Sequence, residues 1–139
     1  MKRSFLTFLL FCILSQLFSD KPNIVIIFTD DQGYADLGCY GSKTNKTPRL
    51  DQLAKEGTMF TSFYTQAVCG PSRSALLTGR YPCRSKGWGM PAGEITFAEL
   101  IKGAGYQTAC IGKWDVSNRK PIIDRMPNAQ GFDYFFGAL

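Results

Sequence analysis

Apolar runs and helix-ending residues divide residues 20–139 into alternating predicted strands and helices. Residues 23–28 form a continuous apolar run rich in β-branched side chains, which is typical of a strand buried on both faces of a parallel sheet. Residues 58–65 alternate and are rich in aromatic side chains, so we predict a second strand there. Residues 106–111 are predicted as the third strand.

Three predicted helices separate these strands, and each is marked by residues that start or stop a helix. The signals are Thr47 as N-cap with Pro48 and Gly57 for the first helix, Pro71 and Gly79 around residues 71–77 for the second, and a capping box of Thr96 and Glu99 with an end near Gly103 or Gly105 for the third.

This order of strands and helices predicts the α/β class, with a mainly parallel sheet and helices packed on it. Residues 131–137 hold four aromatic side chains between two glycines, and we expect a compact aromatic segment there. Three strands make a small sheet. We therefore expect residues 20–139 to be part of a larger domain.

Residues 1–19 have the pattern of a secretory signal peptide. Lys2 and Arg3 form a basic start, residues 5–14 are apolar, and residues 15–19 are mostly small or polar. The apolar run is shorter than the roughly 20 residues that a stable membrane span needs. We predict cleavage after Ser19 and a secreted or periplasmic protein; the alternatives are an uncleaved anchor or a buried helix.

The composition excludes several kinds of site. The chain has no histidine, which rules out a Ser-His-Asp triad and a His-ligated zinc or haem within these residues. The formal net charge falls from +5 to +3 without residues 1–19, because Lys2 and Arg3 leave with them and no acidic residue does. Such a mild excess does not favour nucleic acid binding, and it is compatible with an anionic substrate.

Four cysteines remain without residues 1–19. In an oxidising compartment they allow two disulfides in any of three pairings. They are Cys39, Cys69, Cys83 and Cys110.

Polar clusters follow the three predicted strands, at residues 29–31, 69–73 and 112–115. Ligand sites in open α/β sheets lie beyond the carboxyl ends of the strands, and these ends meet at one edge of a parallel sheet. We therefore expect the three clusters to form a single site.

Asp30 and Asp31 are candidate metal ligands. Adjacent carboxylates repel each other unless a cation lies between them or one of them takes a proton. Carboxylate oxygens are preferred ligands of Ca²⁺ and Mg²⁺. The alternative is a solvated turn after the strand.

Cys69, Arg73 and Lys113 are candidates for binding an anion. Cys69 lies at or just before the N-terminus of the second helix, where free backbone N–H groups favour negative charge. Arg73 is four residues later, and helical side chains lean toward the N-terminus, so its guanidinium can reach position 69. Lys113 stands at the end of the third strand. The alternative is a buried or disulfide-bonded Cys69 with Arg73 and Lys113 merely exposed.

Residues 69–80, Cys-Gly-Pro-Ser-Arg-Ser-Ala-Leu-Leu-Thr-Gly-Arg, resemble the signature of the type I, formylglycine-dependent sulfatases of the alkaline phosphatase superfamily. Residues 22–34, 36–41, 47–51 and 131–133 resemble that family's N-terminal region in the same order. Within the family the sequence is similar to arylsulfatases and N-acetylgalactosamine-6-sulfatases. The resemblance implies that residues 20–139 are the N-terminal part of a catalytic domain with an alkaline-phosphatase-like sandwich fold.

The resemblance also implies a role for each candidate residue. A separate maturation enzyme would oxidise Cys69 to formylglycine, whose hydrate attacks the sulfur of a sulfate ester. The alcohol leaves, and the second hydroxyl of the hydrate then expels sulfate. Asp30, Asp31 and residue 69 would bind Ca²⁺, or Mg²⁺ in its place. Arg73 would hold the hydrate and Lys113 would contact the sulfate.

The sequence departs from the family pattern at Asp115, which stands where the family usually has a histidine, two residues after the lysine. A carboxylate cannot donate positive charge to the leaving oxygen. Asp115 is therefore either a proton carrier or a residue whose usual role lies elsewhere in the protein.

Taken as implied by the resemblance, the function is hydrolysis of sulfate esters on a small molecule or a glycan. Two alternatives stay open. One is hydrolysis of phosphate mono- or diesters within the same superfamily. The other is a catalytically incomplete fragment, because the family's remaining metal ligands come from later sequence.

Overall fold

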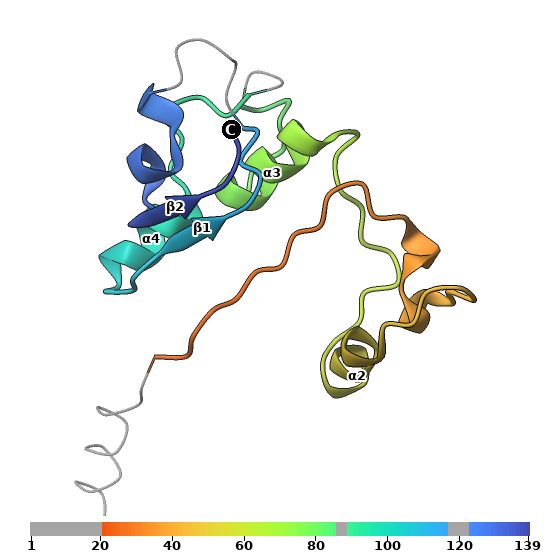
Figure 1. Ribbon diagram of the computed structural model, residues 1–139. Coiled ribbons are helices and arrows are strands. Elements are labelled where there is room, and N and C mark those ends of the chain that lie inside the picture. The colour runs from red at the N-terminus through yellow and green to blue at the C-terminus, as the bar shows by residue number, and fades with distance from the viewer. Residues whose placement is uncertain (1–20, 86–88, 117–122) are drawn as a thin grey trace, which may run out of the picture.

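The computed structural model describes residues 21–85, 89–116 and 123–139. They form two regions, which we call the N-terminal arm (residues 21–68) and the compact region (residues 69–85, 89–116 and 123–139). Residues 23–28 of the arm run beside the compact region, whereas residues 34–56 lie to one side of it (Figure 1). The predicted signal peptide lies outside the described residues. Among the residues that are described, none belongs to a helix both long enough and apolar enough to cross a membrane.

The arm contains the helix α2 (Pro48–Glu56) and two 3₁₀ turns, η1 (Tyr34–Asp36) and η2 (Gly38–Tyr40). Helix α2 has the predicted bounds, with Pro48 in its first turn and Gly57 at its end. Thr47 precedes the helix, but its hydroxyl does not cap it. The hydroxyl instead donates to Asp51 and accepts the N–H of Gly38, which ties η2 to the helix.

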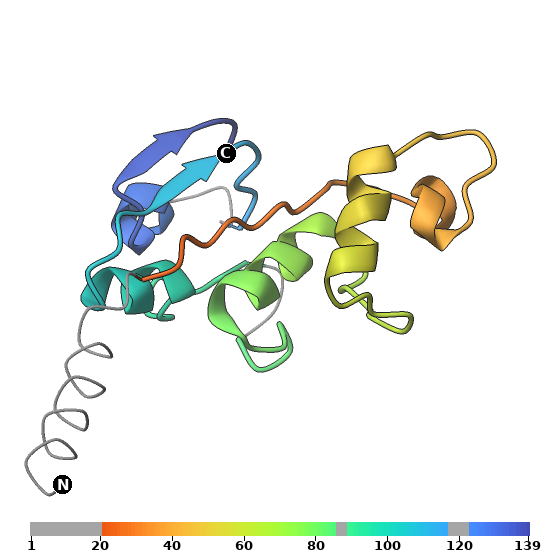
Figure 2. The same cartoon turned by 90° about the horizontal axis from the view of Figure 1, so that it is seen from below.

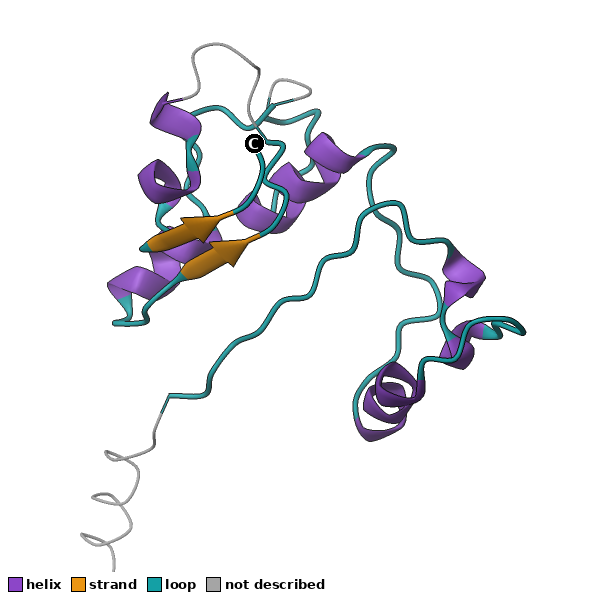
Figure 3. Cartoon of the chain, viewed as in Figure 1, coloured by secondary structure: helices purple, strands orange, loops and turns teal. Residues whose placement is uncertain are grey.

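The strands predicted at residues 23–28 and 58–65 are wrong for this structure. Both segments are loops (Figure 3). The apolar side chains of residues 24–27 are between 48% and 81% exposed. The apolar run is present, but a strand also needs a neighbouring strand to share its backbone hydrogen bonds. No described segment pairs with either of them.

Two helices of the compact region follow their sequence signals. Helix α3 (Cys69–Thr78) begins two residues before the predicted start and ends at Gly79 in a left-handed conformation. Helix α4 (Phe97–Gly103) has the predicted capping box. The Thr96 hydroxyl accepts the Glu99 N–H at 3.2 Å, and the Glu99 carboxylate accepts the Thr96 N–H at 2.7 Å.

The strands β1 (Ala109–Ile111) and β2 (Tyr134–Phe136) form a parallel pair, with Cys110 opposite Phe135. Strand β1 is the shorter core of the strand predicted at residues 106–111. The aromatic segment was not predicted to be a strand, yet it supplies β2. Helices α3 and α4 lie on one side of the pair (Figure 2). The α/β class and the parallel pairing are thus confirmed.

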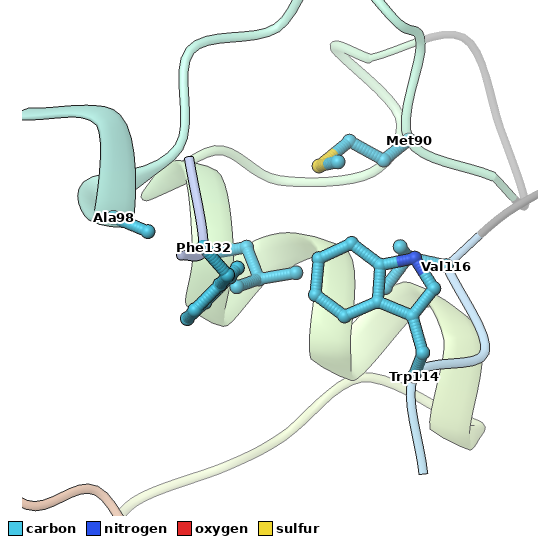
Figure 4. Packing of buried hydrophobic residues seen from close by; sticks show 6 residues of the cluster. Met90, Ala98, Trp114, Val116 and Phe132 are labelled. Atoms are coloured by element: carbon cyan, nitrogen blue, oxygen red, sulfur yellow. The ribbon is translucent and has the colours of Figure 1, made fainter. Parts of the chain in front are cut away.

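The core of the compact region lies between the strand pair and the helices. Trp114 is 2% exposed, and its ring meets Phe132 edge-on at 5.8 Å (Figure 4). Phe132 meets Phe97 of α4 in the same way at 6.1 Å. These contacts fix the chain just after β1, where the third polar cluster lies. The buried hydrophobic residues are Leu77, Met90, Ala98, Trp114, Val116 and Phe132.

The turn after the strands depends on two glycines. The strand pairing continues past β1, because Gly112 N–H donates to Phe136 and Trp114 N–H donates to Ala138. A Cβ atom on Gly137 would lie 1.8 Å from the Gly112 carbonyl oxygen, so only glycine fits there. Gly112 has φ +107°, which other residues rarely adopt.

Candidate active site

Helix α3 places Cys69 and Arg73 one turn apart. Cys69 is the first residue of the helix and is half-buried. The Arg73 side chain is only 11% exposed, and its guanidinium lies 5.3 Å from the centre of the Phe28 ring. Its Nη1 donates to the Lys113 carbonyl at 2.8 Å, whereas its Nε is buried without a partner among the described residues.

The segment after β1 places Lys113 and Asp115. Trp114 lies between them and is buried, which anchors the backbone of both neighbours. Asp115 has φ +46°, a left-handed conformation that is uncommon outside glycine, although aspartate and asparagine tolerate it better than most. Its carboxylate lies 3.6 Å from Lys113 Nζ.

Asp30 connects the arm to these residues. Its Oδ1 accepts from Arg73 Nη2 at 3.2 Å, and its Oδ2 accepts from Lys113 Nζ at 2.9 Å. The hydrogen bond from Lys113, followed by that from Arg73, lowers the pKa of the Asp30 carboxyl. The pKa of Lys113 is raised, chiefly by Asp30 and to a smaller extent by Cys69. We call these five residues the site cluster: Asp30, Cys69, Arg73, Lys113 and Asp115.

Asp31 follows directly and is exposed, with a left-handed backbone at φ +53°. The structure gives it no hydrogen bond or ion pair within residues 21–85, 89–116 and 123–139. Nor do these residues gather three acidic or cysteine side chains in one group that could hold a metal ion. The oxygen donors of Asp30 and Asp31 suit Ca²⁺ or Mg²⁺, so they fit such an ion as part of a ligand set.

A pocket of about 450 Å³ adjoins the site cluster, between residues 23–28 and β1. Arg73 and Lys113 are among its lining residues, and most of the remaining lining is apolar. It lies beside the free edge of β1. We interpret it as a gap in the packing next to the sheet and not as a cleft for an anionic substrate.

The structure therefore brings residues from all three sequence-predicted polar clusters together and leaves Asp31 apart from the ion pairs. Sequence reasoning did not identify the Phe28 ring or the Lys113 carbonyl as partners of Arg73. An aromatic residue at the end of an apolar run carries no signal of that contact. The four cysteines of the described residues are free thiols, so neither disulfide that the sequence allowed is formed among them.

Comparison with known proteins identifies the family whose sequences this chain resembles. A family model described as "Sulfatase" matches residues 22–139. Human steryl-sulfatase is 41% identical over 138 residues, and human arylsulfatase A is 47% identical over 127 residues. The alignments cover 86% and 84% of this chain. The chain spans about a quarter of the length of these relatives, 24% and 25% respectively.

Solved structures show the same relationship. Ps i-CgsB is 41% identical, with a TM-score of 0.73 over 85% of this chain and 28% of its own. BT33336S-sulf, described in connection with the metabolism of multiple glycosaminoglycans by Bacteroides thetaiotaomicron, is 38% identical, with a TM-score of 0.75 over 86% of this chain and 28% of its own. The described fold is therefore part of the fold that these proteins share.

Proposed function

Because the chain belongs to the sulfatase family, we propose that it acts in a sulfuric ester hydrolase, with residues 20–139 as the N-terminal part of the catalytic domain. The observation that carries this proposal is the convergence of Asp30, Arg73 and Lys113 beside Cys69 at the start of α3. These residues come from segments far apart in the sequence. A merely exposed basic side chain would not need such a convergence.

Arg73 and Lys113 supply positive charge where a sulfate ester would gain negative charge. Oriented charge in a partly desolvated site is usually the largest contribution to such catalysis. Arg73 is held from two sides, by the Lys113 carbonyl and by the Phe28 ring, so it needs little reorganisation. Its Nε has no partner among the described residues, and we propose that it donates to an oxygen on residue 69 in the matured protein.

Two groups would complete the chemistry. Cys69, oxidised by a separate maturation enzyme to formylglycine, would supply the nucleophilic hydroxyl of an aldehyde hydrate. Ca²⁺, or Mg²⁺ in its place, would polarise the sulfate oxygens and be held by Asp30, Asp31 and residue 69. Further ligands would have to come from outside the described residues, since these gather no set of three.

The relatives support a sulfate ester over the phosphate ester that the superfamily also allows, because the family model and the named relatives are sulfatases. Ps i-CgsB was also solved in complex with k-i-k-neocarrahexaose. We propose a sulfated small molecule or glycan as substrate here. A signal peptide at residues 1–19 would direct the protein to a secreted or periplasmic location.

The proposal is tested with the full-length protein co-expressed with a formylglycine-generating enzyme. We expect hydrolysis of a chromogenic aryl sulfate, faster than that of the matching aryl phosphate. Cys69→Ala should abolish sulfate release, because the nucleophile is lost. Cys83→Ala is the matched control, since Cys83 is an exposed thiol outside the site cluster, and it should leave the rate unchanged.

Equal rates for Cys69→Ala and the parent protein would overturn the proposed function. A faster reaction with the aryl phosphate would replace it with phosphate ester hydrolysis. Absence of turnover in fully matured parent protein would favour the catalytically incomplete alternative.

A further inference from the structure

Asp30 has two roles that need the same carboxylate oxygens: pairing with basic side chains and binding a cation. In this structure Oδ1 accepts from Arg73 and Oδ2 accepts from Lys113. The proposed function, on which this inference rests, also gives Asp30 to a cation. A carboxylate that turns its oxygens to a cation weakens its bonds to both basic side chains. Each basic side chain then needs another partner if it is to stay in place.

Arg73 already has such partners. Its Nη1 donates to the Lys113 carbonyl at 2.8 Å, and its guanidinium lies over the Phe28 ring. The Arg73 side chain is also mostly buried. Arg73 can therefore keep its place when Asp30 turns away.

Lys113 has a single alternative carboxylate among the described residues. Asp115 Oδ2 lies 3.6 Å from Lys113 Nζ, longer than the 2.9 Å to Asp30 and within the range of an ion pair. The Asp115 side chain is 25% exposed, less than the 41% of Asp30. It is therefore the better shielded of the two carboxylates.

The backbone holds Asp115 in that position. Trp114 is buried in the core, and its N–H donates to the Ala138 carbonyl. Asp115 itself adopts the left-handed conformation at φ +46°. Such strain persists only where the surrounding structure imposes it. The separation of Lys113 and Asp115 is thus set by the fold and not by a loose surface contact.

We propose that Asp115 is a positioning residue, which takes over the Lys113 ammonium when Asp30 turns to a bound cation. A histidine cannot do this while it is positively charged. With aspartate at position 115, the Lys113 ammonium can exchange its ion pair with Asp30 for one with Asp115. Lys113 stays near the start of α3 in both arrangements, and the oxygens of Asp30 become free to bind the cation.

The test is a Ca²⁺ titration of the full-length matured protein by calorimetry. Asp115→Asn should weaken Ca²⁺ binding about fivefold, the size of a partly exposed ion pair, because Lys113 then stays on Asp30. Asparagine tolerates the left-handed backbone, so the variant should fold. Lys113→Met removes the competing ammonium, and adding Asp115→Asn to it should change the Ca²⁺ affinity no further.

The combination with Lys113→Met separates this transfer from a simple charge effect. Loss of a negative charge near a cation would weaken binding equally with or without Lys113, and that result would overturn the proposal. An unchanged Ca²⁺ affinity in Asp115→Asn would overturn it too. Glu56→Gln is the matched control, because it removes one exposed carboxylate on α2 in the arm, and it should leave the affinity unchanged.

Failure of this inference differs from failure of the proposed function. A parent protein that neither binds Ca²⁺ nor hydrolyses aryl sulfate would overturn both. A parent protein that does both, with an Asp115→Asn variant of unchanged Ca²⁺ affinity, would overturn only the role of Asp115.

Discussion

The arm and the compact region have similar fractions of apolar residues but differ in how far they bury them. In the compact region Trp114, Phe132 and Met90 are almost fully buried against α3 and α4. In the arm Phe63 is 73% exposed and Val25 is 81% exposed. The difference lies in the neighbouring elements. Two strands and two helices enclose the side chains of the compact region, whereas among the described residues no strand pairs with the apolar run of the arm.

The site cluster joins the two regions. Arg73, Lys113 and Asp115 are fixed by the packed region, whereas Asp30 comes from the extended arm. Both basic residues and Asp115 are therefore held by the core, and only the contacts of Asp30 depend on how the arm lies against it.

Trp114→Ala should have the largest effect. Truncating a fully buried tryptophan leaves a cavity and removes its contact with Phe132, which costs about 3–5 kcal/mol of unfolding free energy. Urea unfolding of the chain measures this cost. A loss under about 1 kcal/mol would mean that the core is not packed as described.

Thr96→Ala should have an intermediate effect of about 1–2 kcal/mol, as expected for the loss of a helix cap. The Thr96 hydroxyl caps α4 and also donates to the buried Gln130 carbonyl at 2.8 Å. Urea unfolding again gives the value. Thr44→Ala, at an exposed position of the arm, is the control, and an equal loss in both variants would contradict the role of the cap.

Asp133 should make stability depend on pH. Lys102, and then the N–H and hydroxyl of Thr108, lower the pKa of its carboxyl. A carboxyl whose pKa is lower in the folded state stabilises the fold above its unfolded pKa of about 4, and this contribution is lost as the pH falls through the lower, folded value. Melting temperatures of the parent protein should therefore drop in acid more steeply than those of Asp133→Asn. Parallel curves would contradict the assignment.

Phe63→Ala should have the smallest effect. The ring is mostly exposed and contacts only Phe60 as an aromatic partner among the described residues, at 6.0 Å. Its removal from the 139-residue chain should change the free energy of unfolding by less than about 0.5 kcal/mol. A cost near that of Trp114→Ala would show that the arm is packed in solution and would remove the contrast between the regions.

The sequence predicted elements well where the signal was local. Proline, glycine and the Thr96–Glu99 capping box act within a few residues of themselves, and the three helices formed close to the predicted positions. It failed where a second segment decides. Residues 23–28 have the composition of a strand but no partner strand in the part of the chain that the structure describes, whereas residues 134–136 lie in an aromatic segment and become a strand because β1 lies beside them.

The candidate site follows the same division. The residue types and their place after apolar runs could be read from the sequence. The rule that strand ends meet at one edge of a sheet does not explain why the clusters meet, because only residues 112–115 follow a strand in this structure. The particular pairings could not be read from the sequence. That Asp30 accepts from both Arg73 and Lys113, and that Asp115 lies within reach of the same ammonium, depends on the fold of segments some 40 to 80 residues apart.

The most direct test of the proposed chemistry is the mass of the proteolytic peptide that carries residue 69, taken from full-length protein made together with a formylglycine-generating enzyme. We expect the mass of a peptide in which the CH₂–SH side chain of Cys69 has become an aldehyde. A peptide found only with the unmodified thiol would contradict the account of catalysis.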